Sequence, residues 1–130
     1  MKKVLLFICS KNLRDRIVYT FKGTAGCEAL VIPDVRELRS GFSRLRREGD
    51  GCGETFPTLI ILDCSEDIQG VTFFVRWLRT VEHWSHPILC TVPREIWDTA
   101  AVQDLRELFK CECVEPWQWI YPTYRLLTLV

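Results

Sequence analysis

A carboxylate ends the most apolar short segment of this chain. Residues 58–62 read Thr-Leu-Ile-Ile-Leu, with Pro57 before them and Asp63 directly after them. A short run that is apolar at nearly every position is typical of a strand buried on both faces, and such strands belong to parallel sheets. Because ligands of parallel sheets bind at the carboxyl ends of the strands, Asp63 stands where an α/β protein carries out its chemistry.

Other acids could join Asp63 in holding a hard cation. Glu66 and Asp67 follow the same strand, and Glu115 follows the last apolar segment before the C-terminal region. Carboxylate oxygens are ligands that Mg²⁺ prefers, so Asp63, Glu66 and Glu115 form one candidate set. We favour the alternative in which Glu66 and Asp67 lie on a solvated loop, and we predict no metal site.

Cysteine offers a second kind of chemistry. The seven cysteines are Cys9, Cys27, Cys52, Cys64, Cys90, Cys111 and Cys113. An odd number without a Cys-x-x-Cys pair fits neither a disulfide scaffold nor a zinc site. Those near predicted strand ends, Cys9, Cys64, Cys90 and Cys113, could bind a soft metal or form a redox pair. Because pleating turns neighbouring residues to opposite faces, we expect buried, unreactive thiols in a reduced, cytoplasmic protein, with Cys52 the best candidate for an exposed, oxidisable thiol.

The composition limits the class of protein. The chain has 130 residues, with 17 Lys and Arg against 17 Asp and Glu, so we expect a single domain, residues 1–130, without direct nucleic-acid binding. No apolar run approaches the roughly 18 residues that a membrane span needs, so no membrane contact is predicted. The apolar residues 4–9 are followed by charged residues and not by a cleavage site, which favours a first strand over a signal peptide.

Strands and helices are predicted to alternate along the chain. The predicted strands span residues 4–9, 28–32, 58–63, 87–92 and 111–114. The predicted helices begin near Asn12, Val35, Gly70, Trp97 and Pro122, and residues 48–54 are expected to form a Gly-rich surface loop. The apolar face of the fourth helix is expected to be Trp97, Ala101, Leu105 and Leu108.

This alternation implies an α/β fold with a parallel sheet covered by helices on both faces. Periodicity cannot give the order of the strands. The flavodoxin-like order 2-1-3-4-5, a five-stranded (βα)5 sandwich, is a common solution for a chain of this size.

Four segments, in this order and at this spacing, match the landmarks of one family. They are residues 59–63 (Leu-Ile-Ile-Leu-Asp), 76–79 (Arg-Trp-Leu-Arg), 87–91 (Pro-Ile-Leu-Cys-Thr) and 114–117 (Val-Glu-Pro-Trp). Together they resemble the third strand, the end of the third helix, the fourth strand and the Val-Lys-Pro-Phe segment of the response-regulator receiver domain, the family of the bacterial chemotaxis regulator. The resemblance covers nearly the whole chain.

The resemblance implies a role for three residues. Asp63 corresponds to the aspartate that the family phosphorylates. Thr91 corresponds to the hydroxyl that hydrogen-bonds the phosphoryl group and communicates its presence. Glu112 takes the position of the aromatic switch residue on the fifth strand.

Other positions depart from the family's pattern. The acid pair that holds Mg²⁺ in the family corresponds to Cys9 and Ser10, or to Ile8 and Cys9 in a register shifted by one, and its lysine corresponds to Glu115. A neutral thiol is a poor ligand for Mg²⁺, and phosphoryl transfer needs cations that stabilise the charge of the transition state. We therefore expect a degenerate pseudo-receiver that is not an enzyme and binds no cofactor.

Signalling through protein–protein contact is the predicted function. The resemblance implies a face made by the fourth helix, fifth strand and fifth helix, which would bind a histidine kinase, a downstream effector or a second copy. Aromatic residues, which are enriched at binding hot spots, occur in this region at Trp97, Trp119, Tyr121 and Tyr124.

Two alternative functions stay open. The first is an atypical response regulator that a histidine kinase still phosphorylates on Asp63 with Mg²⁺. The second is a flavodoxin-like redox or small-molecule-binding domain, which is weakly supported because residues 10–12 do not form a Ser/Thr/Gly-rich phosphate cradle.

Overall fold

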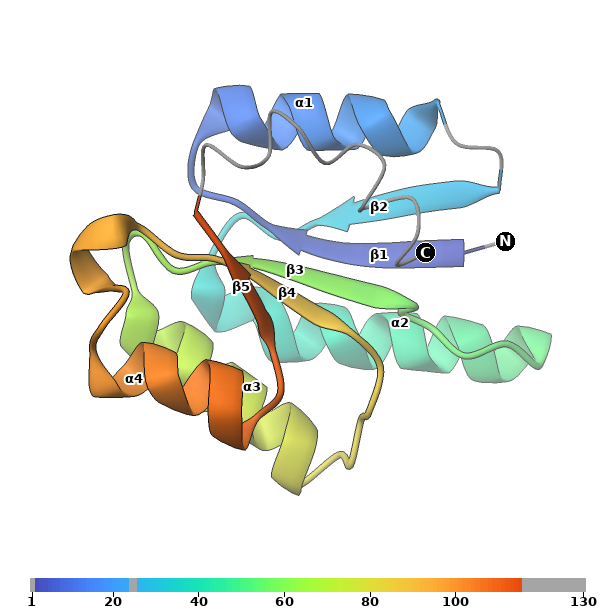
Figure 1. Ribbon diagram of the computed structural model, residues 1–130. Coiled ribbons are helices and arrows are strands. Elements are labelled where there is room, and N and C mark those ends of the chain that lie inside the picture. The colour runs from blue at the N-terminus through green and yellow to red at the C-terminus, as the bar shows by residue number, and fades with distance from the viewer. Residues whose placement is uncertain (1, 24–25, 116–130) are drawn as a thin grey trace.

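Five parallel strands form the central sheet of the computed structural model, which describes residues 2–23 and 26–115 (Figure 1). The strands are β1 (Lys2–Phe7), β2 (Cys27–Val31), β3 (Leu59–Asp63), β4 (Ile88–Thr91) and β5 (Glu112–Val114). Their order in the sheet is β2-β1-β3-β4-β5. The predicted flavodoxin-like strand order is therefore confirmed.

Helices cover both faces of this sheet, with α1 on one face and α2, α3 and α4 on the other (Figure 1). The helices are α1 (Lys11–Lys22), α2 (Leu38–Cys52), α3 (Ile68–Thr80) and α4 (Ala100–Gln103). Short 3-10 turns span Val35–Glu37 and Arg94–Ile96, and a π-helical segment, Asp104–Leu108, continues α4.

Each strand feeds two separate cores because successive side chains point to opposite faces. In β1, Val4 and Leu6 pack with Phe21 of α1, whereas Leu5 and Phe7 belong to the core beneath α2 and α3. All five residues of β3 are buried, as the apolar run predicted. The sheet is thus enclosed on both faces, and its strand ends are where polar side chains can gather.

Two helix boundaries differ from the predictions. Ser10, and not Asn12, caps α1, because its hydroxyl accepts the N–H of Leu13 at 3.4 Å. Residues 48–52, expected to be part of a loop, are the last turns of α2, which ends at the left-handed Gly53 (φ 72°). A Cβ on Gly49 would lie 2.7 Å from the carbonyl oxygen of Glu54, so this glycine lets the chain fold back closely against the helix.

The buried face of α4 also differs from the prediction. Val102, Leu105 and Phe109 are buried, whereas Leu108 is 64% exposed. The N–H of Phe109 donates to the carbonyl of Asp104 at 2.9 Å, which is the wider hydrogen-bond spacing of a π-helix. This wider turn rotates Phe109 into the core in place of Leu108.

The C-terminal predictions lie outside the described residues. They comprise the last helix, expected to begin at Pro122, and three of the predicted contact residues, Trp119, Tyr121 and Tyr124. Within residues 2–23 and 26–115, no helix is both long enough and apolar enough to span a bilayer.

Candidate functional site

Asp63 and Thr91 end two neighbouring strands at the carboxyl edge of the sheet. Asp63 of β3 and Thr91 of β4 are register partners, and they are the two buried polar residues among those described, with 4% and 1% of their surface exposed. The predicted placement of Asp63 at this edge, beside Thr91, is therefore what the structure shows.

Two main-chain donors hold the Asp63 carboxylate. Its Oδ2 accepts the N–H of Cys9 at 2.9 Å, and its Oδ1 accepts the N–H of Ser65 at 2.9 Å. A buried carboxylate without hydrogen bonds would be costly, and bonds from N–H groups to a charged acceptor are stronger than neutral ones. Both oxygens of Asp63 are thus engaged by the loops that follow β1 and β3.

Thr91 differs from Asp63 in its hydrogen bonding. Its main-chain carbonyl accepts the N–H of Cys64 at 2.9 Å, but its hydroxyl is buried and has no hydrogen-bond partner in the described part of the chain. An unsatisfied buried polar group costs about 1–3 kcal/mol, so its presence calls for an explanation. A hydroxyl in this position is able to bond a group attached to, or bound beside, Asp63.

The residues that replace the family's acid pair supply no charged oxygen. Cys9 is half-buried, and burial together with the negative charge of Asp63 raises the pKa of its thiol to about 12, so the thiol stays protonated at neutral pH. Ser10 caps α1 with its hydroxyl. The loop after β1 therefore passes directly into a helix and offers neither a carboxylate nor a phosphate cradle.

A cavity of about 260 Å³ lies beside Cys9, and acidic residues line part of it. Asp34 pairs with Arg36 at 2.8 Å, and the hydrogen bonds from Arg36 lower the pKa of Asp34 to about 2. Glu66 and Asp67 are exposed on the loop before α3, as expected, and Asp67 also caps α3 by accepting the N–H of Gly70 at 2.8 Å. Asp34 and Asp67 are thus committed to local structure.

Mg²⁺, which the receiver fold implies, does not fit this donor set. The guanidinium of Arg14 lines the cavity beside Cys9, where a divalent cation would meet a like charge. In the ranges 2–23 and 26–115, no group of three His, Cys, Asp or Glu side chains is placed to hold a metal ion. The oxygens that an octahedral Mg²⁺ site needs are not assembled around Asp63.

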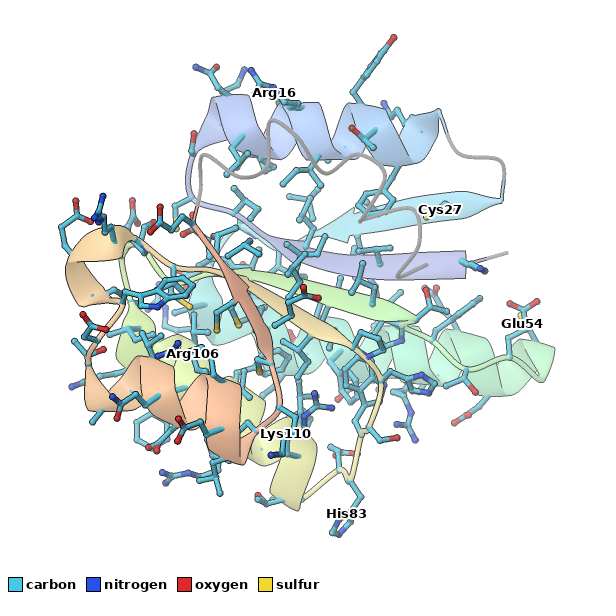
Figure 2. All side chains as sticks on the ribbon, in the orientation of Figure 1. Arg16, Cys27, Glu54, His83, Arg106 and Lys110 are labelled. Carbon is cyan, nitrogen blue, oxygen red and sulfur yellow. The ribbon has the colours of Figure 1, made fainter. Side chains whose placement is uncertain are left out.

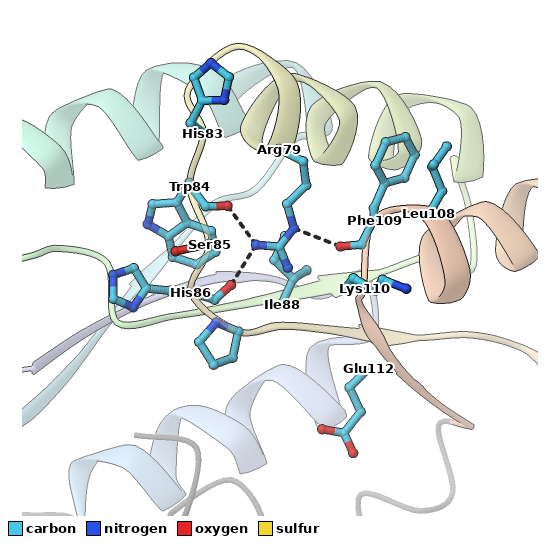
Figure 3. Close-up of a pocket in the computed structure, with 11 residues that line it drawn as sticks. Arg79, His83, Trp84, Ser85, His86, Ile88, Leu108, Phe109, Lys110 and Glu112 are labelled. Atoms are coloured by element: carbon cyan, nitrogen blue, oxygen red, sulfur yellow. Dashed lines mark hydrogen bonds between the residues drawn. The ribbon is translucent and has the colours of Figure 1, made fainter.

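Glu115 and Glu112 lie at different distances from the site. Glu115 directly follows Val114, the register partner of Thr91, so it stands at the same edge of the sheet as Asp63. Glu112 pairs in register with Leu89, which lies two residues before Thr91 on β4. Its side chain lines a cavity of about 550 Å³ (Figure 3). Glu115, expected at the position of the family's lysine, therefore lies close in register to Asp63. Glu112, expected at the position of the aromatic switch residue, belongs to a separate cavity.

Arg79 organises that second cavity, and sequence reasoning did not predict its role. Its Nε donates to the carbonyl of Phe109 at 2.8 Å, and its Nη1 donates to the carbonyls of Trp84 and His86 at 2.7 and 2.9 Å (Figure 3). One guanidinium thus ties the loop before β4 to the turn before β5. The sequence feature that could have predicted this role is a basic residue in the last turn of a helix, where cations bond free carbonyls.

Some exposed apolar side chains of the described residues lie on α3 and on the segment that continues α4. Trp97, a predicted contact residue, is half-buried against the core, and the Arg106 guanidinium lies 5.1 Å from its ring centre. Phe73 of α3 and Leu108 are 62% and 64% exposed. A groove of about 410 Å³ between α3 and α4 is lined by Phe73 and Ala101, among others. We refer to this groove, which the exposed Phe73 lines, as the α3–α4 surface; Leu108 lines the cavity around Arg79 instead.

Several thiols pack in or against one core on the same face of the sheet. Cys64, Cys90 and Cys111 are buried in the core beneath α3 and α4, and Cys113 packs against the same core. Cys90 and Cys113 are register partners on neighbouring strands, so their side chains leave the sheet on the same side. The expected burial is found for Cys64, Cys90 and Cys111, and Cys52 is exposed as expected, whereas the low reactivity of the buried thiols stays a prediction.

Comparisons with known proteins match the fold. Neither a protein-family model nor a curated protein matches the sequence. Among solved structures, the chemotaxis protein CheY4 of Vibrio cholerae superposes with a TM-score of 0.67 at 18% identity, covering 100% of this chain and 99% of that one. A signal receiver domain of a two-component histidine kinase from Clostridium thermocellum also gives 0.67 at 18% identity, covering 98% and 93%. The chain therefore has the fold of the receiver domains of two-component signalling, as the sequence landmarks predicted.

Proposed function

We propose that this chain is a receiver-like signalling module that acts by binding a protein partner, and that it has lost Mg²⁺-dependent phosphorylation of Asp63. The observation that carries the proposal is the bonding of the Asp63 carboxylate. Main-chain N–H groups of Cys9 and Ser65 satisfy its two oxygens, while no group of three acidic, Cys or His side chains in the described chain is placed to hold a cation there. Asp63 then works as a structural acceptor that joins the loops after β1 and β3.

The chemistry of phosphoryl transfer supports this reading. Cations stabilise the charge that spreads over the transferred group. Here one cation site is replaced by a protonated thiol, and the lysine position carries Glu115. A phosphoryl group on Asp63 would add negative charge near that acid, which disrupts by repulsion.

A partner is expected on the α3–α4 surface. Large apolar side chains that remain exposed beside a groove are candidates for buried anchors in an interface. The partner classes are those of receiver signalling: a histidine kinase, a downstream effector or a second copy of the chain. Because all seven cysteines are free, the proposal includes a reducing compartment such as the cytoplasm.

Beryllofluoride binding tests the proposal, because this anion mimics a phosphoryl group on an aspartate. The ¹⁵N-labelled chain is titrated with beryllofluoride with and without Mg²⁺, and the amide signals of Cys9, Ser65 and Thr91 are followed. We expect no Mg²⁺-dependent shift. Shifts that need Mg²⁺ and vanish in Asp63→Asn would overturn the proposal.

A second candidate function is an atypical receiver that is still phosphorylated on Asp63. The buried hydroxyl of Thr91, without a partner in the described chain, favours it, because a phosphoryl oxygen would satisfy that hydroxyl. Transfer of labelled phosphate from a histidine kinase, abolished by Asp63→Asn and retained in Glu66→Gln, would establish this function in place of the first.

A further inference from the structure

The four thiols beneath α4 form one cluster around Cys90. Cys64, Cys90 and Cys111 are buried in one core, Cys113 packs against it, and Cys90 is fully buried. Figure 2 shows sulfur atoms in the region of β4 and β5. Two of these residues come from neighbouring strands, one follows β3, and one precedes β5. The fold, and not the local sequence, brings them together.

Cys113 is the member of the cluster that solvent can reach. It is half-buried, whereas Cys64, Cys90 and Cys111 are buried. The hydrogen bond from the Cys90 thiol, and then the positive charge of Arg106, lower the pKa of the Cys113 thiol. The hydrogen bonds of Cys90 to its neighbours raise the pKa of the Cys90 thiol. A half-buried thiol with a lowered pKa therefore stands beside a buried thiol with a raised pKa.

The sheet places this pair at a distance that a disulfide can bridge. Cys90 and Cys113 are register partners in the β4–β5 ladder. Neighbouring strands lie about 4.8 Å apart, and disulfides join Cα atoms that are about 4.4–6.8 Å apart. The Cα separation typical of register partners on neighbouring strands therefore falls within the range that disulfides span.

We propose that Cys113 is a peroxide-reactive thiol and that Cys90 resolves its oxidised form as a Cys90–Cys113 disulfide. The Cys113 thiolate attacks one oxygen of hydrogen peroxide, the O–O bond breaks, and hydroxide leaves, so Cys113 becomes a sulfenic acid. The Cys90 sulfur then attacks the Cys113 sulfur, the S–O bond breaks, and the hydroxyl leaves as water with the Cys90 proton. Peroxide gains two electrons and the two thiols lose them. A thiol reductant such as glutathione reverses the reaction.

This device does not depend on the proposed function, but it acts close to the same site. Cys90 directly precedes Thr91, and Cys113 directly precedes Val114, the register partner of Thr91. The disulfide would fix β5 to β4 one residue away from Thr91. Oxidation of the two thiols therefore acts on the carboxyl edge of the sheet without Mg²⁺ or a phosphoryl group.

Disulfide mapping after peroxide treatment tests the proposal. The full chain carrying Cys52→Ser, which removes the exposed thiol, is treated with hydrogen peroxide, alkylated, digested and analysed by mass spectrometry. We expect two fewer free thiols, a cross-linked peptide pair containing Cys90 and Cys113, and complete reversal by dithiothreitol. Oxidation that leaves Cys90 and Cys113 unlinked, or that links Cys90 to Cys64 or Cys111 instead, overturns the proposal.

Three variants separate the roles within the cluster. Cys113→Ser should abolish the cross-link. Cys64→Ser should form the cross-link at the same rate as the chain that keeps Cys64. Arg106→Gln keeps both thiols and should slow the cross-link several-fold at neutral pH, because the Cys113 thiolate loses a nearby cation. Arg106→Gln keeps the proposal testable if Cys113→Ser does not fold. An unchanged rate in Arg106→Gln, or a retained cross-link in Cys113→Ser, contradicts the assignment.

Discussion

The main-chain N–H of Cys9 donates a 2.9 Å hydrogen bond to Oδ2 of Asp63, so the position where a receiver would carry an acid contributes a donor. Ser65 supplies the second donor from the loop after β3. Asp63 thereby links two loops that are far apart in the sequence. Main-chain dipoles compensate its charge, and this compensation makes its contribution to stability measurable.

Replacing Asp63 by asparagine should destabilise the fold. Asparagine keeps one acceptor oxygen, but its NH₂ group would face one of the two N–H donors and leave that donor unsatisfied. We expect the free energy of unfolding to fall by about 1–3 kcal/mol, measured by urea denaturation. Glu66→Gln is the control, with an expected change within about 0.5 kcal/mol. If Asp63→Asn were as stable as the unsubstituted chain, or more stable, the surroundings of the Asp63 carboxylate would repel its charge and not stabilise it.

Replacing Thr91 by valine should stabilise the fold. Valine has nearly the shape of threonine but lacks the hydroxyl, which is buried here without a partner in the described chain. We expect the free energy of unfolding to rise by about 1 kcal/mol, seen as a higher urea midpoint. Thr91→Ser keeps the hydroxyl and loses a methyl group, so it should lower stability by about 1 kcal/mol. Destabilisation by valine would show that the hydroxyl has a partner.

The sequence was sufficient to place Asp63 and Thr91, but it could not place the thiols. The apolar run before Asp63 predicts a buried strand by itself, and parallel strands present their carboxyl ends at one edge. Whether Cys90 and Cys113 share a face depends on the pairing of Leu89 with Glu112, which is a property of the assembled sheet. Pleating within one strand carries no information about that register.

The wrong predictions about the helices have local structural causes that composition and periodicity do not reveal. Glycine residues predicted a loop at 48–54, yet here they lengthen α2, because Gly49 allows a close approach of the main chain. In α4, an apolar spacing of 3.6 residues selected Leu108, whereas the π-helical turn buries Phe109. Periodicity assumes one hydrogen-bond pattern, and it fails where that pattern changes.

The Cys9 thiol should make stability depend on pH in the alkaline range. Its pKa rises from an ordinary value of 9.0 to about 12 in the folded chain, because burial and Asp63 disfavour the thiolate. A raised pKa means that the stabilisation is complete below about pH 9 and is lost as the pH rises towards 12. The decline of the urea midpoint above pH 9 should be shallower in Cys9→Ser. At pH 8, iodoacetamide should alkylate the exposed Cys52 much faster than Cys9; equal rates would contradict the raised pKa.

Two glycines of α2 should respond to alanine in opposite directions. A Cβ at position 49 would lie 2.7 Å from the Glu54 carbonyl oxygen and 2.9 Å from the Phe56 nitrogen, whereas nothing lies within 4 Å of one at position 51. Gly49→Ala should therefore cost about 1–3 kcal/mol through displacement of the main chain. Gly51→Ala should add about 0.5–1 kcal/mol, because alanine favours the helix. Thermal unfolding followed by circular dichroism measures both, and a neutral Gly51→Ala would indicate that this segment is a loop.

Arg79 should contribute more to stability than Arg76, the other basic residue of α3. Its guanidinium donates to carbonyls of Trp84, His86 and Phe109, so Arg79→Ala leaves three acceptors without this donor. We expect a loss of about 3 kcal/mol in the free energy of unfolding. Lysine has a single charged group and cannot span both loops as the planar guanidinium does, so Arg79→Lys should recover only part of the loss.

Arg76, one turn earlier on α3, provides the matched control. Its guanidinium lies 6.0 Å from the ring centre of the exposed Phe73, and Arg76→Ala should change stability by about 0.5 kcal/mol or less. Amide hydrogen exchange gives a second readout, because loss of the Arg79 contacts should speed exchange in β5 before it affects β1. Similar effects of the two substitutions would mean that Arg79 acts only as a surface charge, whereas a selective effect on β5 would show that it holds the edge strand of the sheet in place.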